Sequence, residues 1–275
     1  MNARVSKTMS QDITNILNLI EETKQESSYT VELNNKDNPV FIPMSAEDQK
    51  NLIKAVVDSP YYSNIFNVTI IDILEKTYIN GGSILSKDID QYDKTKILLK
   101  CRSVNIDDEY TKTFTDDEGK EFEKKISLES HISKNTSKKP KEVKIEHNSY
   151  EIILNYPSLK SEYDLEKYIV NQLKKIDESN QYALKGLIAT IFLVNIAKYI
   201  QSIKIKDTHI NFDSISAADK IKVTSPLGST IINKIIKEID KTFATGISNL
   251  LTYKFKHKSE DYSLKINIDN TFFIT

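Results

Sequence analysis

The sequence predicts an α+β fold in which a mixed β-hairpin region is followed by a mainly helical C-terminal half. Two patterns favour this class. Between Tyr29 and Tyr156, short apolar runs alternate with polar residues on either side of turn-forming segments. After Pro157, apolar residues recur with helical spacing. The chain of 275 residues contains only 6 glycines, which argues against a turn-dense barrel, and its length suits one large or two modest domains.

We expect three regions along the chain: an N-terminal amphipathic helix or arm over 1–28, an α+β region with hairpins over 29–160, and a mainly helical region over 161–275 that ends in a strand. In the first region, apolar residues fall on one helical face: Ile13, Ile16, Leu17 and Ile20. The stretch that follows this face is polar. The helix is therefore either an arm that docks on a partner or a helix that packs on its own domain.

The α+β region begins with a predicted hairpin, because Tyr29 to Leu33 alternates and a turn at Asn34 to Asn38 precedes Val40 to Pro43. Ser45 and Asp48 resemble the pattern that caps a helix start, and Pro60 should stop that helix. A second helix carries Ile65 to Tyr78 and ends before Gly81-Gly82. The region thus opens with one hairpin and two helices.

The rest of this region reads mainly as strands. The run Thr95 to Ile106 predicts a strand with Ile97, Leu99 and Cys101 on one face. Two further hairpins are expected, one formed by Tyr110 to Phe114 and Phe122 to Leu128, and one from Val143 to Tyr156 across His147 to Ser149. Between them, Ser130 to Lys141 offers almost no apolar side chain for burial and reads as an exposed loop.

The last region predicts helices from Ser161 to Ile176, from Leu187 to Ile203 and from Ser225-Pro226 to Phe243, separated by a short turn at Ser216 to Val223. The second of these is apolar nearly all round, as a central helix should be. Gly246 either breaks the third helix or lies within it at a cost of about 1 kcal/mol. The tail alternates at Leu264, Ile266 and Ile268 and ends in Phe272-Phe273-Ile274, which predicts a final strand.

The charge balance disfavours nucleic acid as a partner. Lys and Arg number 38 and Asp and Glu 39, so the net charge is -1 and the positive field of general nucleic-acid binders is missing. Arg4 and Arg102 are the only arginines. The best basic cluster, between Lys134 and Lys144, lacks interleaved aromatic residues and arginines. It is therefore a flexible charged loop or a contact for an acidic partner.

No pattern of residues predicts catalysis, a cofactor or a metal site. The glycines fit neither a nucleophile elbow nor a phosphate-binding loop, and His131, His147, His209 and His257 share no metal-binding spacing. The single cysteine, Cys101, excludes an intramolecular disulfide and fits a reducing compartment. The N-terminus has no apolar core of a secretory signal. The most apolar stretch, from Leu187 to Ala197, is about half the roughly 20 residues that cross a bilayer.

Three ordered segments resemble a known family. The first comprises Tyr29 to Leu33 and then Phe41-Ile42-Pro43. The second, from Ile89 to Val104, carries Tyr92-Asp93 and Arg102-Ser103, and the third ends in Tyr156-Pro157-Ser158-Leu159. Together they resemble the baseplate hub proteins of T-even-like phages with contractile tails. The resemblance covers roughly 29–159, and the N-terminal helix and the Phe272-Phe273 tail have no counterpart in it.

The resemblance implies a non-enzymatic structural component of the central hub of the baseplate, with a place in the virion tail after synthesis in the host cytoplasm. Its partners would be other baseplate and tail proteins, and a homo-oligomer in a symmetric assembly would fit. A dissociable assembly chaperone is the alternative function, and a hub-associated hydrolase is a weaker one. The resemblance also implies structural roles for the motif residues Tyr92, Asp93, Arg102, Ser103, Tyr156 and Pro157. Arg102 either pairs with an acidic side chain such as Asp93 or lies on the surface.

Overall fold

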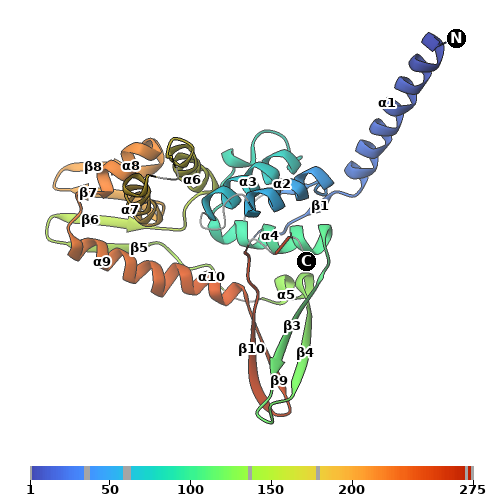
Figure 1. The fold of residues 1–275 in the computed structure, drawn as a ribbon. Coiled ribbons are helices and arrows are strands. Elements are labelled where there is room, and N and C mark those ends of the chain that lie inside the picture. Colours follow the sequence, from blue (N-terminus) through green and yellow to red (C-terminus); the bar gives the residue numbers. More distant parts are fainter. Residues whose placement is uncertain are drawn as a thin grey trace.

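The computed structural model of the chain describes residues 2–33, 38–57, 63–135, 138–177, 180–269 and 272–273. In these residues, helices combine with small antiparallel sheets (Figure 1), which confirms the predicted α+β class. The helices are α1 (Asn2–Glu26), α2 (Ala46–Val57), α3 (Ser63–Thr77), α4 (Gln91–Asn105), α5 (Leu128–Lys134), α6 (Leu159–Leu173), α7 (Gln181–Ala197), α8 (Ala217–Thr224), α9 (Ser229–Glu238) and α10 (Thr245–Leu250). The strands are β1 (Tyr29–Thr30), β2 (Val40–Phe41), β3 (Glu109–Thr115), β4 (Glu121–Ser127), β5 (Val143–His147), β6 (Tyr150–Leu154), β7 (Ile200–Ile205), β8 (Thr208–Asn211), β9 (Thr252–His257) and β10 (Glu260–Lys265).

The predicted N-terminal elements are confirmed. Helix α1 projects away from the body of the molecule (Figure 1), and strands β1 and β2 pair antiparallel as the first hairpin. Ser45 and Asp48 cap α2 as expected: the Asp48 amide donates to the Ser45 hydroxyl at 3.2 Å, and the Asp48 carboxylate accepts from the Ser45 amide at 2.8 Å. The predicted turn at Asn34 to Asn38 lies, except for Asn38, outside the described residues, and so does the helix stop at Pro60.

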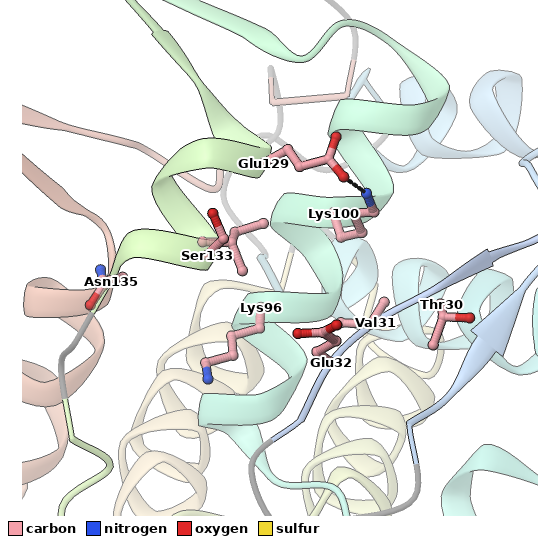
Figure 2. Close-up of a pocket in the computed structure, with 9 residues that line it drawn as sticks. Thr30, Val31, Glu32, Lys96, Lys100, Glu129, Ser133 and Asn135 are labelled. Atoms are coloured by element: carbon pink, nitrogen blue, oxygen red, sulfur yellow. Dashed lines mark hydrogen bonds and ion pairs between the residues drawn. The ribbon is translucent and has the colours of Figure 1, made fainter.

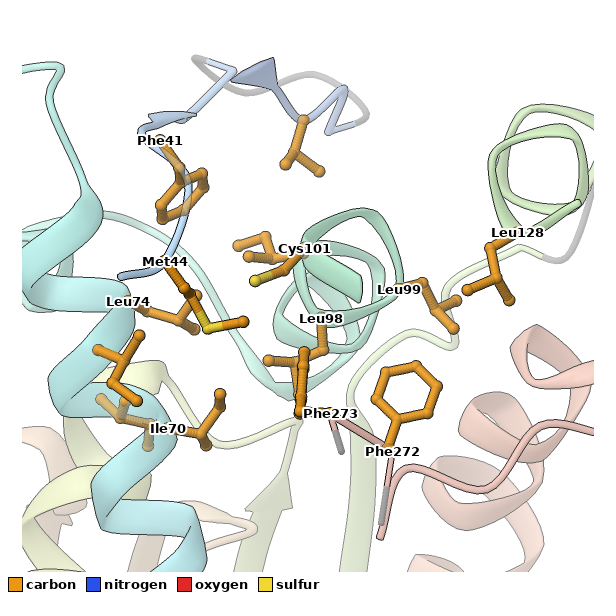
Figure 3. Packing of buried hydrophobic residues seen from close by; sticks show 14 of the residues in the cluster. Phe41, Met44, Ile70, Leu74, Leu98, Leu99, Cys101, Leu128, Phe272 and Phe273 are labelled. Atoms are coloured by element: carbon orange, nitrogen blue, oxygen red, sulfur yellow. The ribbon is translucent and has the colours of Figure 1, made fainter. Parts of the chain in front are cut away.

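The strand predicted over Thr95 to Ile106 is wrong, because this segment lies within helix α4 up to Asn105, and Ile106 is the residue that caps the end of the helix. Its apolar run is buried all round, including Ile97, Leu98 and Leu99 in succession, whereas a half-buried strand would bury alternate residues. Figure 3 shows α4 amid a hydrophobic core, here called the first core, between Phe41 on one side and Phe272 on the other. Burial on every side removes the one-sided pattern that identifies a helix in a sequence.

Two hairpins project together below α4 (Figure 1). The first, β3–β4, was predicted, and its turn contains Gly119 with a φ of +79°, a conformation that favours glycine. The second, β9–β10, contains the predicted final strand, but that strand ends at Lys265, and Phe272 and Phe273 form a buried turn. Aromatic rings join the two hairpins, with the Phe114 and Phe255 centroids 5.4 Å apart.

The loop predicted over Ser130 to Lys141 is wrong in its first part, where α5 extends to Lys134. The Ser127 hydroxyl caps this helix by accepting from the amide of Ser130 at 3.0 Å. Residue Leu128 provides the apolar anchor, since it is fully buried in the first core. The segment therefore has a short helix fixed by one buried leucine.

The second half of the molecule contains a four-stranded antiparallel sheet with the strand order β5-β6-β7-β8. The hairpin β5–β6 was predicted, and Asn148 takes a φ of +52° in its turn. The helix predicted over Leu187 to Ile203 is wrong at its C-terminal end, because α7 stops at Ala197 and β7 starts at Ile200. Nor is α7 central, since Ile188 and Phe192 are more than half exposed. Strand β8 was not predicted.

Helices cover both faces of this sheet (Figure 1), with α6, α7 and α8 on one side and α9 on the other. Helix α6 begins two residues earlier than predicted, with Ser158 as its cap. The predicted turn over Ser216 to Val223 is largely helix α8, and the helix predicted from Ser225-Pro226 begins at Ser229. That helix continues through a π-helical turn, Ile239–Ala244, into α10, so Gly246 does not break it.

Two large hydrophobic clusters organise the described chain. The first surrounds α4 and includes residues from the N-terminal hairpin, α3 and the C-terminal tail. The second lies between the sheet and the α9–α10 helix. The chain thus contributes residues to the two clusters alternately. The predicted division of the chain into three regions, with boundaries after residues 28 and 160, stays a prediction. Within the described ranges, none of the helices combines the length and apolar character that crossing a membrane requires.

Candidate functional site

Two motif segments that are distant in the sequence lie side by side. The segment Ile89–Asp93 leads into α4, and the segment Tyr156–Leu159 leads into α6. A bridge pairs Asp90 with Ser158 in an antiparallel sense. Two backbone hydrogen bonds flank it: from Gln91 N to Pro157 O at 3.0 Å, and from Leu159 N to Ile89 O at 2.7 Å. The two segments therefore form one structural unit, here called the motif junction.

Asp93 lies in the helix-start network of α4. The Asp90 carboxylate accepts from the amides of Tyr92 and Asp93 at 3.0 and 3.1 Å, and the Asp93 carboxylate accepts from the Asp90 amide at 3.4 Å. Lys139 forms ion pairs with both carboxylates. Burial and the neighbouring charge of Asp93 raise the pKa of the Asp90 carboxyl, and Lys139 acts in the opposite direction. The junction thus fixes the loop that contains Lys139.

Tyr92 and Tyr156 meet inside the protein, with ring centroids 5.7 Å apart. The Tyr156 hydroxyl donates to the backbone carbonyl of Phe243 at 3.0 Å, and the Tyr156 and Phe243 rings are edge to face. Burial raises the pKa of the Tyr156 hydroxyl, so the group stays protonated and remains a donor. The contact joins the motif junction to the π-helical turn between α9 and α10.

Pro157 and Ser103 have simpler surroundings. Pro157 is buried at the motif junction, where its carbonyl accepts from Gln91. Ser103 is half-buried and donates to the carbonyl of Lys100 in its own helix at 2.8 Å. The structure therefore brings together Tyr92, Asp93, Tyr156 and Pro157, whereas Ser103 lies elsewhere along α4.

Arg102 lies near the other end of α4, nine residues after Asp93 or about 13 Å along the helix axis. The surface alternative is wrong, because Arg102 is only 6% exposed, and its pairing with an acidic side chain stays a prediction. Its guanidinium lies 5.7 Å from the Tyr110 ring centroid and 5.3 Å from that of Phe272. Burial lowers the pKa of Arg102. Arg102 thus lies between hairpin β3–β4 and the C-terminal tail.

A buried ionic layer beside the motif junction was not predicted. Lys94 of α4 and Glu162 of α6 form an ion pair of 2.6 Å, with side chains 7% and 2% exposed. One turn further along α6, Glu166 accepts from Asn64 of α3. The sequence held a signal for this layer, because Glu162 and Glu166 share a helical face with the apolar Leu165 and Ile169.

A pocket of about 290 Å³ lies where α4, α5 and the β1 segment meet (Figure 2). Lys100 and Glu129 form an ion pair at this pocket, and Lys96 and Glu32 also line it. Burial lowers the pKa of Lys96. The lining is mostly polar or charged. Across the described ranges, no group of three or more His, Cys, Asp or Glu side chains is arranged to hold a metal ion.

Two exposed apolar helix faces are candidate contact surfaces. On α1, side chains between 47% and 60% exposed are Ile13, Ile16, Leu17, Leu19 and Ile20. On α7, side chains between 51% and 89% exposed are Tyr182, Ile188 and Phe192. Apolar groups that recur on one helical face in this way are typical of a surface that binds another protein.

Comparison with known proteins identifies the family. Residues 10–266 match the model of a family described as "T4 bacteriophage base plate protein". No curated protein matches the chain. No solved structure matches it either. The match extends beyond the three motif segments at both ends and includes much of α1, for which sequence analysis found no counterpart. The chain therefore belongs to the T4 bacteriophage base plate protein family.

Proposed function

We propose that the chain is a non-enzymatic structural component of the central hub of a contractile-tail baseplate and that it acts through contacts with other tail proteins. The family match over residues 10–266 carries this proposal. The exposed apolar faces of α1 and α7 support it, because a subunit of a large assembly needs surfaces that become buried against neighbours. The chain would reach the tail after synthesis in the host cytoplasm.

The motif junction supports a structural rather than a chemical role for the motif residues. Tyr92, Asp93, Tyr156 and Pro157 are buried and make contacts within the chain. Residues that bind a substrate need access to it. Buried motif residues are instead suited to holding α4, α6 and the α9–α10 helix in one rigid arrangement, which would fix the relative positions of the surfaces that meet other subunits.

The principal test is copurification from infected cells. A tagged copy of the chain is expected to copurify with baseplate proteins and with tail intermediates. A matched control carries Ile16→Asp and Leu17→Asp, which place charge on the exposed face of α1 without touching the body of the protein. If the unmodified chain is absent from every tail intermediate, the proposal is wrong.

The alternative function is that of a dissociable assembly chaperone. The projecting helix α1 would also suit this function. Mass spectrometry of purified virions separates the two functions, because a permanent subunit is present in finished particles and a chaperone is not. A hydrolase that acts on cell wall or nucleic acid is a further alternative. Lysis and nuclease assays with the purified chain are expected to show no activity, and activity in either assay would contradict the proposal.

A further inference from the structure

Strand β1 has one open edge. Among the described residues its sheet has two strands, so β2 pairs with β1 on one side only. The Val31 amide donates to the carbonyl of Pro39 at 3.0 Å, which directs the polar backbone groups of Val31 towards the β2 side. Because these groups alternate in direction along an antiparallel strand, the N–H and C=O of Thr30 and Glu32 point away from β2.

The bonds of the facing residue confirm this alternation. Val40 lies opposite Thr30 in the hairpin. Its amide donates to the side chain of Asn80, and its carbonyl accepts from the amide of Ile79 at 3.0 Å. Both partners lie in the segment that pairs with the far side of β2. The bonds of Val40 therefore point away from β1, and the backbone groups of Thr30 are left for a further strand.

The open edge forms one wall of the pocket of about 290 Å³ described above. Residues 30–32 line this pocket, together with Lys96 and Lys100 of α4 and Glu129 of α5 (Figure 2). Its volume is near the lower end of the range of about 300–1,000 Å³ for ligand pockets. The pocket therefore suits a side chain and the backbone next to it.

Lys96 presents a buried charge to this pocket without a counter-charge. It is only 9% exposed, and its ammonium lies 5.6 Å from the centroid of the Tyr92 ring. Among the described residues, no carboxylate lies within ion-pair distance of Lys96, whereas Lys100 is paired with Glu129. Figure 2 shows Lys96 directed away from that pair. A buried ammonium without a counter-charge is costly, so a carboxylate that enters the pocket would gain from contact with it.

The other nearby charges do not satisfy Lys96. Burial lowers the pKa of its ammonium, and the charges of Asp93 and Lys139 have smaller effects of opposite sign. Asp93 and Lys139 are already paired with each other. Glu32 lines the pocket but is exposed, so water and salt screen its charge.

We propose that this pocket binds an extended segment of a partner protein, which pairs with the open edge of β1 and places an aspartate or glutamate against Lys96. The inference goes beyond the proposed function, because it assigns a binding site and the chemistry of its ligand.

Backbone and side chain have separate roles in this contact. Hydrogen bonds to the free N–H and C=O groups of Thr30 and Glu32 provide affinity for any extended segment. The carboxylate provides specificity, since it neutralises the buried charge of Lys96. Successive side chains of a strand point to opposite faces, so the acidic residue would be flanked by residues that point away from Lys96.

The test is selection from a library of heptapeptides on the purified full chain. The selected peptides are expected to share an aspartate or glutamate at one position, between residues that favour strands. Replacing that residue by asparagine or glutamine should weaken binding about tenfold, as measured by fluorescence anisotropy. Failure to select any peptide, or selection of peptides without an acidic residue, would overturn the proposal.

Two matched variants test the role of Lys96. Lys96→Met should remove the preference for the acidic residue. Urea denaturation should show no loss of stability in this variant, because the substitution removes a buried charge that lacks a counter-charge. Lys237→Met changes the net charge equally but at an exposed position on α9, and it should leave the preference intact. A preference that survives Lys96→Met contradicts the proposal.

A second pair of variants tests the strand edge. Thr30→Pro removes an N–H that points away from β2, so the hairpin keeps its bonds and binding should weaken about three- to tenfold. Thr30→Val keeps this N–H and should bind like the unmodified chain. Urea denaturation of both variants checks that the fold is preserved. If Thr30→Pro binds the peptide unchanged, or if free acetate binds as tightly as the peptide, the ligand is not an extended segment and the proposal is wrong.

Discussion

The hydroxyl of Tyr156 donates to the backbone carbonyl of Phe243 at 3.0 Å, across 87 positions of sequence. This hydrogen bond joins a motif residue in the segment that leads into α6 to the π-helical turn that connects α9 and α10. π-Helical turns form where a helix accommodates one extra residue, and they often mark functionally constrained positions. The α9–α10 helix is thus fixed to the motif junction at its least regular point.

Gly246 should be irreplaceable at this contact. A Cβ atom there would lie well inside contact distance of the Tyr156 hydroxyl and 2.7 Å from Cγ of Pro140. Gly246→Ala is expected to lower the free energy of unfolding by about 1–3 kcal/mol because of overpacking. Urea denaturation measures this change. The matched control is Gly186→Ala in α7, where nothing lies within 4 Å, and this variant should gain about 0.5–1 kcal/mol. Equal effects of both substitutions would contradict the packing argument.

The sequence was sufficient to predict those elements whose apolar residues lie on one face and whose turn or cap residues are close by in the chain. The hairpins around Gly119 and Asn148 combine alternating apolar residues with a turn residue suited to positive φ, and both were found. Helix α2 was found because Ser45 and Asp48 mark its start. In each case a few neighbouring residues contain the whole signal.

The segment around α4 shows where this approach fails. A short apolar run that is buried on all sides fits a strand as well as a helix, so periodicity does not decide between them. The deciding signal was the pair Asp90 and Asp93, which caps the helix start. The contact between Tyr92 and Tyr156 could not be predicted from either segment, because it depends on how the chain returns to pack between the two cores.

Arg102 should anchor the C-terminal tail. Arg102→Ala removes the contacts of the guanidinium with Tyr110 and Phe272 and leaves a gap in a buried position. The expected loss in unfolding free energy is about 1–3 kcal/mol. Arg102→Lys keeps the charge but not the planar group that stacks on the rings, so it should recover only part of the loss. Limited proteolysis is expected to cleave the tail faster in both variants. Unchanged folding and hub assembly in Arg102→Ala would exclude an anchoring role.

Asp48 should make the stability depend on pH in the acidic range. Burial tends to raise the pKa of its carboxyl, but hydrogen bonds from Lys76 and Ser45 outweigh this effect and lower the pKa below its usual value. A carboxyl with a depressed pKa in the folded state stabilises the fold above its unfolded pKa of about 3.9, and this contribution is lost as the pH falls through the folded pKa. Asp48→Asn should therefore cost about 0.5–2 kcal/mol at pH 7 and progressively less below about pH 4.

Urea denaturation at several pH values measures this dependence. The matched control is Asp261→Asn, because Asp261 forms an ion pair with Lys256 in which both side chains are exposed. That variant should change the unfolding free energy by less than about 1 kcal/mol at pH 7. A cost of Asp48→Asn that stays constant down to the lowest pH would show that the charge of Asp48 does not contribute.

The buried pair Lys94–Glu162 should be far more sensitive than a surface pair. Glu162→Gln leaves the Lys94 ammonium buried without its counter-charge, and the expected loss is about 3–5 kcal/mol. Replacing both residues by apolar side chains, Lys94→Met with Glu162→Leu, should restore most of this loss, because no buried charge remains. The control is Asp164→Asn in the same helix, whose partner Lys160 is 63% exposed, and it should cost less than about 1 kcal/mol. If the double variant is as unstable as Glu162→Gln, the instability of Glu162→Gln does not come from an isolated buried charge. The attraction between Lys94 and Glu162 would then be what holds α4 to α6.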